Sequence, residues 1–165
     1  GSPIGLRQTA GMTPAVRALE AAGAWFVLHP YERDDSRADF GVEAADALGV
    51  EAERVFKTIL VDLDGHEAVA IVPVTCRVGL KAVAAALGGK RVDTCEPARA
   101  ERITGYVVGG ISPLGQKRRL PTVVDETCEL HDTVFVSGGR RGLDVELRPA
   151  DLVNLTAAVV ADIAV

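Results

Sequence analysis

Short helical and strand patterns alternate along nearly the whole chain of 165 residues, and glycine or proline bounds most of them. No linker, repeat or low-complexity tract interrupts the alternation, so we expect one domain. A chain of this length can bury roughly two-thirds of its unfolded surface without disulfides or metals. The pattern therefore predicts a single α+β or mixed α/β domain built around a central sheet.

The expected helices have an opening proline, apolar residues at helical spacing or a closing glycine. They cover residues 14–22, 42–48, 80–87, 97–104 and 149–158. The expected strands are short apolar or alternating segments. They cover residues 25–28, 56–63, 67–72, 122–125, 133–137 and 143–147. Asp64 and Gly65 join the second and third strands, and this dipeptide favours a type I′ hairpin turn.

Hydropathy, cysteine content and net charge exclude some classes of function. No apolar run approaches the roughly 20 residues of a membrane span, and no signal peptide is recognisable, so we expect no membrane partner. Three widely spaced cysteines, Cys76, Cys95 and Cys128, indicate reduced thiols and a cytoplasmic protein. A net charge of −5 argues against coating of nucleic acid such as DNA, although concentrated cations can still grip RNA locally. Residues 1–11 are interpreted as an expression tag or disordered leader, with Met12 as a natural start.

Residues 105–121 contain four glycines and two prolines, and three consecutive cations, Lys117, Arg118 and Arg119, lie within them. Glycine lets backbone amides approach a ligand closely, and the cations indicate that the ligand is anionic. A P-loop is excluded because Gln116 stands where the phosphate-binding lysine is needed. Ser112 and Ser137 lie in glycine-rich turns. The hydroxyl of each serine either stabilises its turn or contacts a ligand, and the sequence leaves both roles open.

Metal and nucleophile motifs are missing from the sequence. His29, His66 and His131 have no partner at ligand spacing, so we expect no metal site. The cysteines are typical of small buried hydrophobic residues, and no serine lies in a nucleophile elbow.

Lys57 lies at the start of an apolar strand, where a buried charge is costly unless it is paired with an opposite charge or serves the function. It is either an edge-strand lysine reaching solvent or a point charge directed into a pocket. Asp144 lies on another strand and is likewise either solvated or directed into a pocket. The charges of Lys57 and Asp144 could share one site.

Several stretches together resemble the YbaK/EbsC-type aminoacyl-tRNA deacylases. They are Met12-Thr13-Pro14, Phe56-Lys57-Thr58, Gly109-Gly110-Ile111-Ser112-Pro113, Ser137-Gly138-Gly139 and Gly142-Leu143-Asp144. The order of the later motifs is most similar to the free-standing, cysteine-specific type that acts on Cys-tRNA(Pro). The resemblance implies a YbaK-like domain over residues 12–165, with a curved mixed sheet surrounded by helices. It also implies that the protein uses no metal and no cofactor.

It also implies a function, which is the removal of cysteine mischarged on tRNA(Pro), with mischarged tRNA and prolyl-tRNA synthetase as partners. In such enzymes the thiol of the cysteinyl group attacks its own ester carbonyl. This releases the tRNA and gives a cysteine thiolactone. The family's functional lysine corresponds to Lys57, and the amides of Gly109 and Gly110 would stabilise the oxyanion. Substrate-binding positions would be Tyr31, Phe40, Thr58, Ser112, Ser137 and Asp144, and tRNA-binding positions Lys117, Arg118, Arg119, Arg140 and Arg141.

Two other readings stay open at this point. One is a deacylase that uses water to hydrolyse alanyl- or seryl-tRNA. Cleavage of an ester whose amino acid has no thiol would identify it. The other is a module that binds tRNA or a synthetase without chemistry, against which a lysine at the start of an apolar strand argues.

Overall fold

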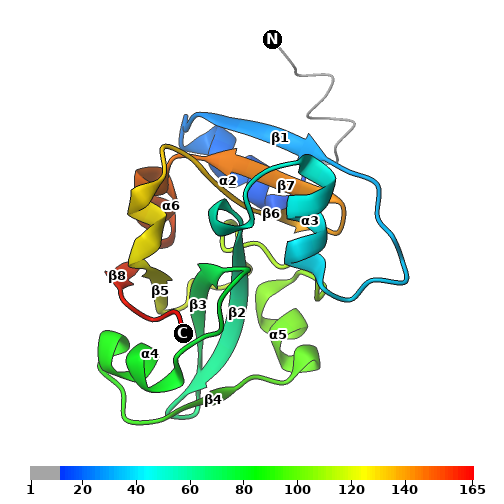
Figure 1. Cartoon of the computed structure of the whole chain (residues 1–165). Helices are drawn as coiled ribbons and strands as arrows, with labels where there is room; N and C mark the ends of the chain where they lie inside the picture. Colours follow the sequence, from blue (N-terminus) through cyan, green and yellow to red (C-terminus); the bar gives the residue numbers. More distant parts are fainter. Residues whose placement is uncertain (1–11) are drawn as a thin grey trace.

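The computed structural model describes residues 12–165, and the expected leader, residues 1–11, lies outside them. The strands form two sheets (Figure 1), one of five strands in the order β4-β2-β3-β5-β8 and one of three in the order β1-β7-β6. The strands are β1 (Phe26–Pro30), β2 (Phe56–Leu63), β3 (His66–Pro73), β4 (Val92–Thr94), β5 (Thr122–Asp125), β6 (Val134–Arg140), β7 (Leu143–Leu147) and β8 (Val159–Ala161). The helices are α2 (Pro14–Ala21), α3 (Phe40–Leu48), α4 (Leu80–Leu87), α5 (Pro97–Thr104) and α6 (Pro149–Thr156), with the 3₁₀ turns η1 (Ala52–Arg54) and η2 (Glu126–Leu130).

The mixed α/β class is confirmed, but the expected central sheet is divided in two. The hairpins β2–β3 and β6–β7 are antiparallel, whereas β3–β5 and β5–β8 are parallel. The β6–β7 hairpin takes β1 as its third strand and does not extend the larger sheet. A parallel bridge from Val55 to Phe135 links the start of β2 to β6, so the two sheets meet there.

Most helix and turn signals are confirmed, although α3 begins at Phe40, two residues before the expected start. The Thr13 hydroxyl accepts a hydrogen bond from the Val16 amide at 3.2 Å and so caps α2. Asp64 and Gly65 both have positive φ, 51° and 90°, as a type I′ turn requires. The last helix ends at Thr156 and not at the expected Ala158, because Ala157 adopts a left-handed conformation with φ 52°.

Apolar side chains from both sheets form the core. One cluster joins α2 and the three-stranded sheet to β2, β3 and β5 of the larger sheet. It includes Leu19, Val136 and Val145, all fully buried. A second lies between α4 and the larger sheet and includes Val72 and Val83. None of the helices formed by residues 12–165 is long and apolar enough to cross a membrane.

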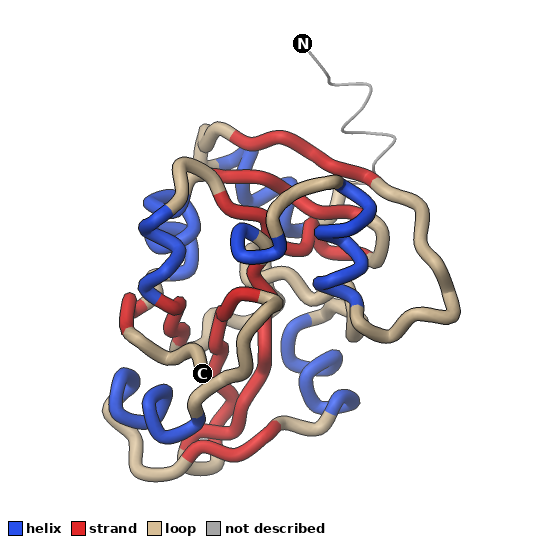
Figure 2. The backbone as a smooth tube through the Cα atoms, in the orientation of Figure 1, coloured by secondary structure: helices blue, strands red, loops and turns tan. Residues whose placement is uncertain are grey.

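The glycine-rich segment, residues 105–121, is an ordered connection without regular structure before β5 (Figure 2). The Tyr106 hydroxyl donates to the Leu114 carbonyl at 2.7 Å, which fastens the segment across its own turn. Gly115 lies against the start of α2, where an added Cβ would come within 2.3 Å of the Pro14 carbonyl oxygen. Part of this segment therefore needs glycine for packing, in addition to the ligand role expected from the sequence.

Candidate functional site

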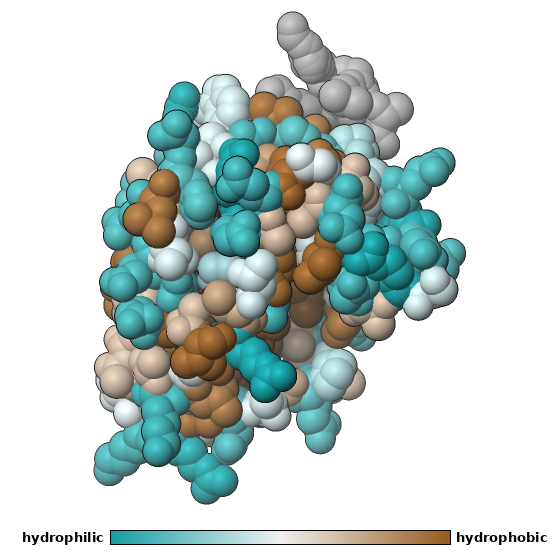
Figure 3. Space-filling model, viewed as in Figure 1, coloured by the Kyte–Doolittle hydropathy of each residue, from teal (hydrophilic) through white to brown (hydrophobic). Residues whose placement is uncertain are grey.

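A cavity of about 450 Å³ opens where the two sheets meet α3 and α5. Figure 3 shows the molecule hollowed in this region, with hydrophobic residues at the floor. Its walls come from the segment before α3, from the start of β2, from α5, from the glycine-rich segment and from the β6–β7 hairpin. A volume of this size is in the range of small-molecule sites in proteins.

The start of β2 provides one wall through Phe56, Lys57 and Thr58. Burial lowers the pKa of Lys57, and the nearby Arg77 lowers it further, while Cys76 acts in the opposite direction. Within residues 12–165 Lys57 forms no ion pair. The Thr58 hydroxyl is buried and has no hydrogen-bond partner in the described part of the chain. Both side chains therefore offer unused polar groups to a ligand.

The β6–β7 hairpin provides the opposite wall through Ser137 and Asp144, which are directly paired across the two strands. Asp144 is 5% exposed and has no ion pair with any described residue. Burial raises the pKa of its carboxyl group from 3.8 to about 7. Tyr31 also lines the cavity, and burial raises its pKa to about 12, with Asp144 adding to the effect. Lys57 and Asp144 thus share one cavity without forming an ion pair.

Phe40, at the start of α3, closes the cavity between two arginines. The guanidinium carbons of Arg33 and Arg141 lie 4.8 and 4.9 Å from the centre of its ring. Arg141 Nε donates to the Val108 carbonyl at 2.8 Å. Gly109 lies against the same ring, since an added Cβ would be 2.8 Å from it, so this position needs glycine. The stack ties the segment before α3 to the glycine-rich segment.

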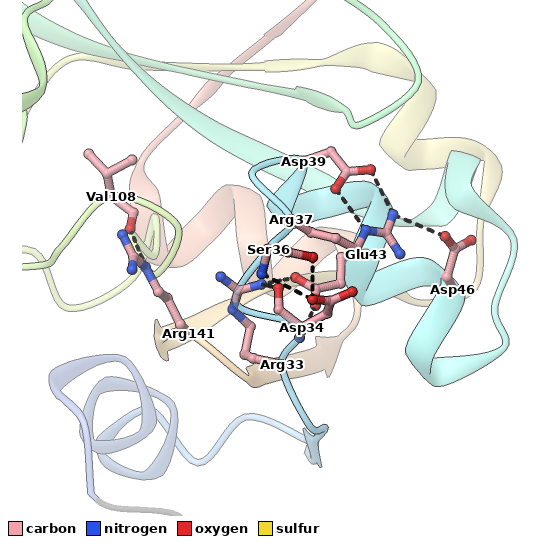
Figure 4. Close-up of polar contacts among 9 residues, drawn as sticks. All are labelled: Arg33, Asp34, Ser36, Arg37, Asp39, Glu43, Asp46, Val108 and Arg141. Carbon is pink, nitrogen blue, oxygen red and sulfur yellow. Dashed lines mark hydrogen bonds and ion pairs between the residues drawn. The ribbon is translucent and has the colours of Figure 1, made fainter.

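The charged segment between β1 and α3 is held by its own ion pairs (Figure 4). Arg37 donates to both carboxylate oxygens of Asp39, at 2.8 and 2.6 Å, and this lowers the pKa of Asp39. Arg33 pairs with the buried Glu43, which also accepts from the Asp34 amide at 2.7 Å. The segment contributes Asp39 to the cavity wall, a residue that the sequence patterns did not single out.

Of the nine expected catalytic and substrate-binding residues, seven meet at this cavity and two do not. Tyr31, Phe40, Lys57, Thr58, Gly109, Ser137 and Asp144 line it. Gly110 does not, and its amide donates to the Val107 carbonyl at 2.8 Å. Ser112 is fully buried, and its hydroxyl accepts from the Leu114 amide at 3.2 Å, so it forms a turn.

The five expected tRNA-binding cations are all exposed but fall into two groups. Arg140 ends β6 and Arg141 begins the turn to β7. Arg141 reaches the cavity through its contact with Phe40. Residues 117–119 lie beyond the end of α5, where the Lys117 amide donates to the Thr104 carbonyl at 3.0 Å.

Neither a metal cluster nor an activated thiol is found in the part of the chain that the structure describes. No group of three or more His, Cys, Asp or Glu side chains within it could hold a metal ion. Cys95 lines the cavity, and burial raises the pKa of its thiol. Cys128 is fully buried, and burial raises its pKa to about 11. A raised pKa makes a thiol a poor nucleophile at neutral pH.

The comparisons with known proteins identify the family. The family model described as aminoacyl-tRNA editing domain matches residues 37–155, which include most of the cavity wall. An Enterococcus faecalis protein named "Putative Cys-tRNA(Pro)/Cys-tRNA(Cys) deacylase EbsC" is 37% identical over 120 residues, covering 72% of this chain and 73% of that protein. The chain belongs to the aminoacyl-tRNA editing domain family.

Solved structures show the same architecture. A crystal structure described as that of a putative trans-editing enzyme for prolyl tRNA synthetase superposes with a TM-score of 0.79 at 26% identity, over 92% of this chain and 95% of that one. A hypothetical protein superposes with a TM-score of 0.82 at 28% identity, over 92% and 99% of the two chains. The expected YbaK-like fold is confirmed.

Proposed function

We propose that this protein is a trans-editing deacylase that removes cysteine from mischarged tRNA(Pro). Membership of the editing family supports deacylation of an aminoacyl-tRNA. The name of the E. faecalis relative supports Cys-tRNA(Pro) as the substrate, and similarity to a trans-editing enzyme for prolyl tRNA synthetase supports that synthetase as a partner. A protein with this task would act in the cytoplasm, where tRNA is charged. A synthetase pocket cannot strongly reject an amino acid of similar size, which explains the need for editing.

The observation that carries the proposal is the chemistry of the cavity wall. The titratable residues that line it, among those described, are Tyr31, Asp39, Lys57, Cys95 and Asp144. They include no histidine, and the thiol of Cys95 is held in its protonated form by burial. The Ser137 hydroxyl accepts from the Gly139 amide, and the Thr58 hydroxyl has no partner among the described residues. No hydroxyl of this wall is therefore hydrogen-bonded to a base that would prepare it to attack an ester. A substrate that brings its own thiol does not need one.

The reaction would then proceed in one intramolecular displacement. The sulfur of the cysteinyl group attacks its own ester carbonyl, a carbon–sulfur bond forms, and the carbon–oxygen bond to the terminal ribose breaks. The thiol proton ends on the released ribose hydroxyl, and the products are uncharged tRNA and cysteine thiolactone. The protein contributes by folding the substrate into the attacking geometry, which alone can lower the barrier by several kcal/mol.

The individual side chains fit this scheme. The Gly109 amide, which has no acceptor among residues 12–165, would donate to the oxyanion in place of the Gly110 amide. The Asp144 carboxylate, buried without a counter-ion, suits the substrate's α-ammonium group. Lys57 would hold the ester end of the terminal nucleotide by its charge. The unpartnered Thr58 hydroxyl would accept or donate a hydrogen bond to the aminoacyl group.

The exposed cations would bind the rest of the tRNA. Arg140 and Arg141 lie beside the cavity and would meet the phosphates nearest the aminoacyl end. Residues 117–119 are exposed beyond α5 and would meet the acceptor stem. Such contacts weaken with salt because they release counterions from the RNA.

Deacylation of Cys-tRNA(Pro) by the Lys57→Ala variant tests the proposal. The wild-type protein should release cysteine in a single-turnover assay, and the variant should lose at least about 10²-fold in rate, as for removal of an electrostatic catalytic group. Lys90→Gln is the matched control, because Lys90 is exposed beside the β2–β3 turn, at the other end of β2. An inactive wild type contradicts the proposed function, and a fully active Lys57→Ala variant contradicts the role of Lys57.

A further inference from the structure

Lys57 is the only lysine on the cavity wall that the described residues form. It is half-buried at the start of β2, where it pairs with Val72 of β3 in the ladder. The other three lysines of the chain, Lys81, Lys90 and Lys117, are exposed and lie outside the cavity lining. A compound that forms inside the cavity therefore meets a single lysine amine, and the three exposed amines serve as references within the same molecule.

The surroundings of Lys57 favour its neutral amine over its ammonium form. Burial lowers the pKa of this group, Cys76 opposes the effect and Arg77 adds to it. Within residues 12–165 no carboxylate forms an ion pair with Lys57, and Asp39, on the same cavity wall, is bonded to Arg37 (Figure 4). A neutral amine is a nucleophile, whereas an ammonium group has no free electron pair. Release of the polyanionic tRNA removes negative charge from the site and favours the amine further.

The other groups on the wall that could accept an acyl group are held in less reactive forms. Burial raises the pKa of the Cys95 thiol and raises that of Tyr31 to about 12, so both carry their protons at neutral pH. Burial also raises the pKa of the Asp144 carboxyl to about 7. The Ser137 hydroxyl accepts from the Gly139 amide at 3.2 Å and is hydrogen-bonded to no carboxylate of the described residues. Among these side chains only the neutral Lys57 amine attacks a carbonyl readily without help from a base.

We propose that Lys57 is a site of self-acylation by the cyclic thioester that forms in this cavity. The inference rests on the proposed function, under which deacylation leaves cysteine thiolactone against the wall that carries Lys57. The Lys57 amine attacks the thioester carbonyl, a carbon–nitrogen bond forms, and the carbon–sulfur bond of the ring breaks. The proton that the nitrogen releases ends on the sulfur, so no further reactant is consumed. The product is a cysteinyl group with a free thiol, joined to Lys57 by an amide bond.

This modification ends the activity of the molecule that carries it. The amide nitrogen is uncharged, so the modified Lys57 side chain no longer holds a substrate by its charge. A cavity of about 450 Å³ has room for the added cysteinyl group, which then occupies the place of the next substrate. Thiols reverse a thioester on Cys95 but not an amide on Lys57. Modified molecules therefore accumulate with turnover.

Labelling with homocysteine thiolactone, a related cyclic thioester, tests the site without any deacylation. After incubation at neutral pH and digestion, mass spectrometry gives the rate of labelling at each lysine. We expect Lys57 to react at least about tenfold faster than each of the three exposed lysines, because binding in the cavity places the carbonyl beside its amine. Lys57→Arg should leave only the slow labelling of the exposed lysines, and the control Lys90→Gln should keep the fast labelling of Lys57. Equal rates at the four lysines, or a label that hydroxylamine removes as it removes a thioester from Cys95, overturns the inference.

Turnover of Cys-tRNA(Pro) separates this inference from the proposed function. Wild type and Lys90→Gln are sampled during multiple turnovers, and the intact mass, the position of the adduct and the remaining deacylation rate are measured together. We expect the mass to rise by one cysteinyl group at Lys57, and the rate to fall in proportion to the modified fraction. Deacylation through many turnovers with Lys57 unmodified, or full activity of the modified protein, overturns the inference and leaves the proposed function standing. A protein that releases no cysteine contradicts the proposed function, and the inference falls with it.

Discussion

The buried carboxyl group of Asp144 should make the stability of this protein depend on pH in a defined direction. Burial raises its pKa from 3.8 to about 7, so the folded state favours the protonated form. The free energy of unfolding therefore falls as pH rises from about 3.8 to about 7, and then levels off. With these pKa values the full loss is about 4 kcal/mol, of which about 3 kcal/mol develops between about pH 5 and about pH 8.

The Asp144→Asn variant removes this titration and nearly keeps the shape of the side chain. Urea unfolding of both proteins at several pH values gives the difference in the free energy of unfolding. The free energy of unfolding of the variant, relative to that of the wild type, should rise by about 3 kcal/mol between about pH 5 and about pH 8. Asp132→Asn, at an exposed position before β6, is the matched control and should follow the wild type. A difference between wild type and Asp144→Asn that does not change with pH would refute the reasoning.

Three further changes test other parts of the structure. Neutralising residues 117–119 should raise KM for charged tRNA and flatten its salt dependence while leaving a minimal cysteinyl ester unaffected, and steady-state kinetics at several salt concentrations would check this. Gly115→Ala should lower the free energy of unfolding by at least about 2 kcal/mol, measured with urea, because φ is +64° and an added Cβ meets the Pro14 carbonyl. Cys95→Ala should keep most of the single-turnover deacylation rate, since burial keeps that thiol protonated; complete loss in a folded variant would make Cys95 the nucleophile.

The elements of the fold were predicted well because their ends carry local signals. Glycines that close α3, α4 and α5 have the left-handed conformation that few other residues adopt. The strands β4 and β8 were missed, since three residues are too few to show an alternation. The division into two sheets was also missed. It depends on which strand β1 pairs with, and this is decided by tertiary packing rather than by local sequence.

Residues of the cavity lining could be picked out from the sequence where a charge contradicts its local pattern. Lys57 and Asp144 are charges on apolar strands, and both line the cavity. Gly110 and Ser112 belong to the same glycine-rich motif as Gly109, but their polar groups are used within the segment. The spacing of a motif cannot show which of its amides and hydroxyls stay free.

Single-turnover deacylation of tRNA(Pro) charged with cysteine, serine or alanine tests the central claim most directly. If the substrate's thiol is the attacking group, Cys-tRNA(Pro) should react at least about 10²-fold faster than the seryl and alanyl forms, because a thiol is partly ionised near neutral pH and a hydroxyl is not. Serine is the sharpest comparison, since it fits the same cavity and differs in one atom. Cleavage of Ser-tRNA(Pro) as fast as Cys-tRNA(Pro) would contradict the account and indicate that the protein activates water instead.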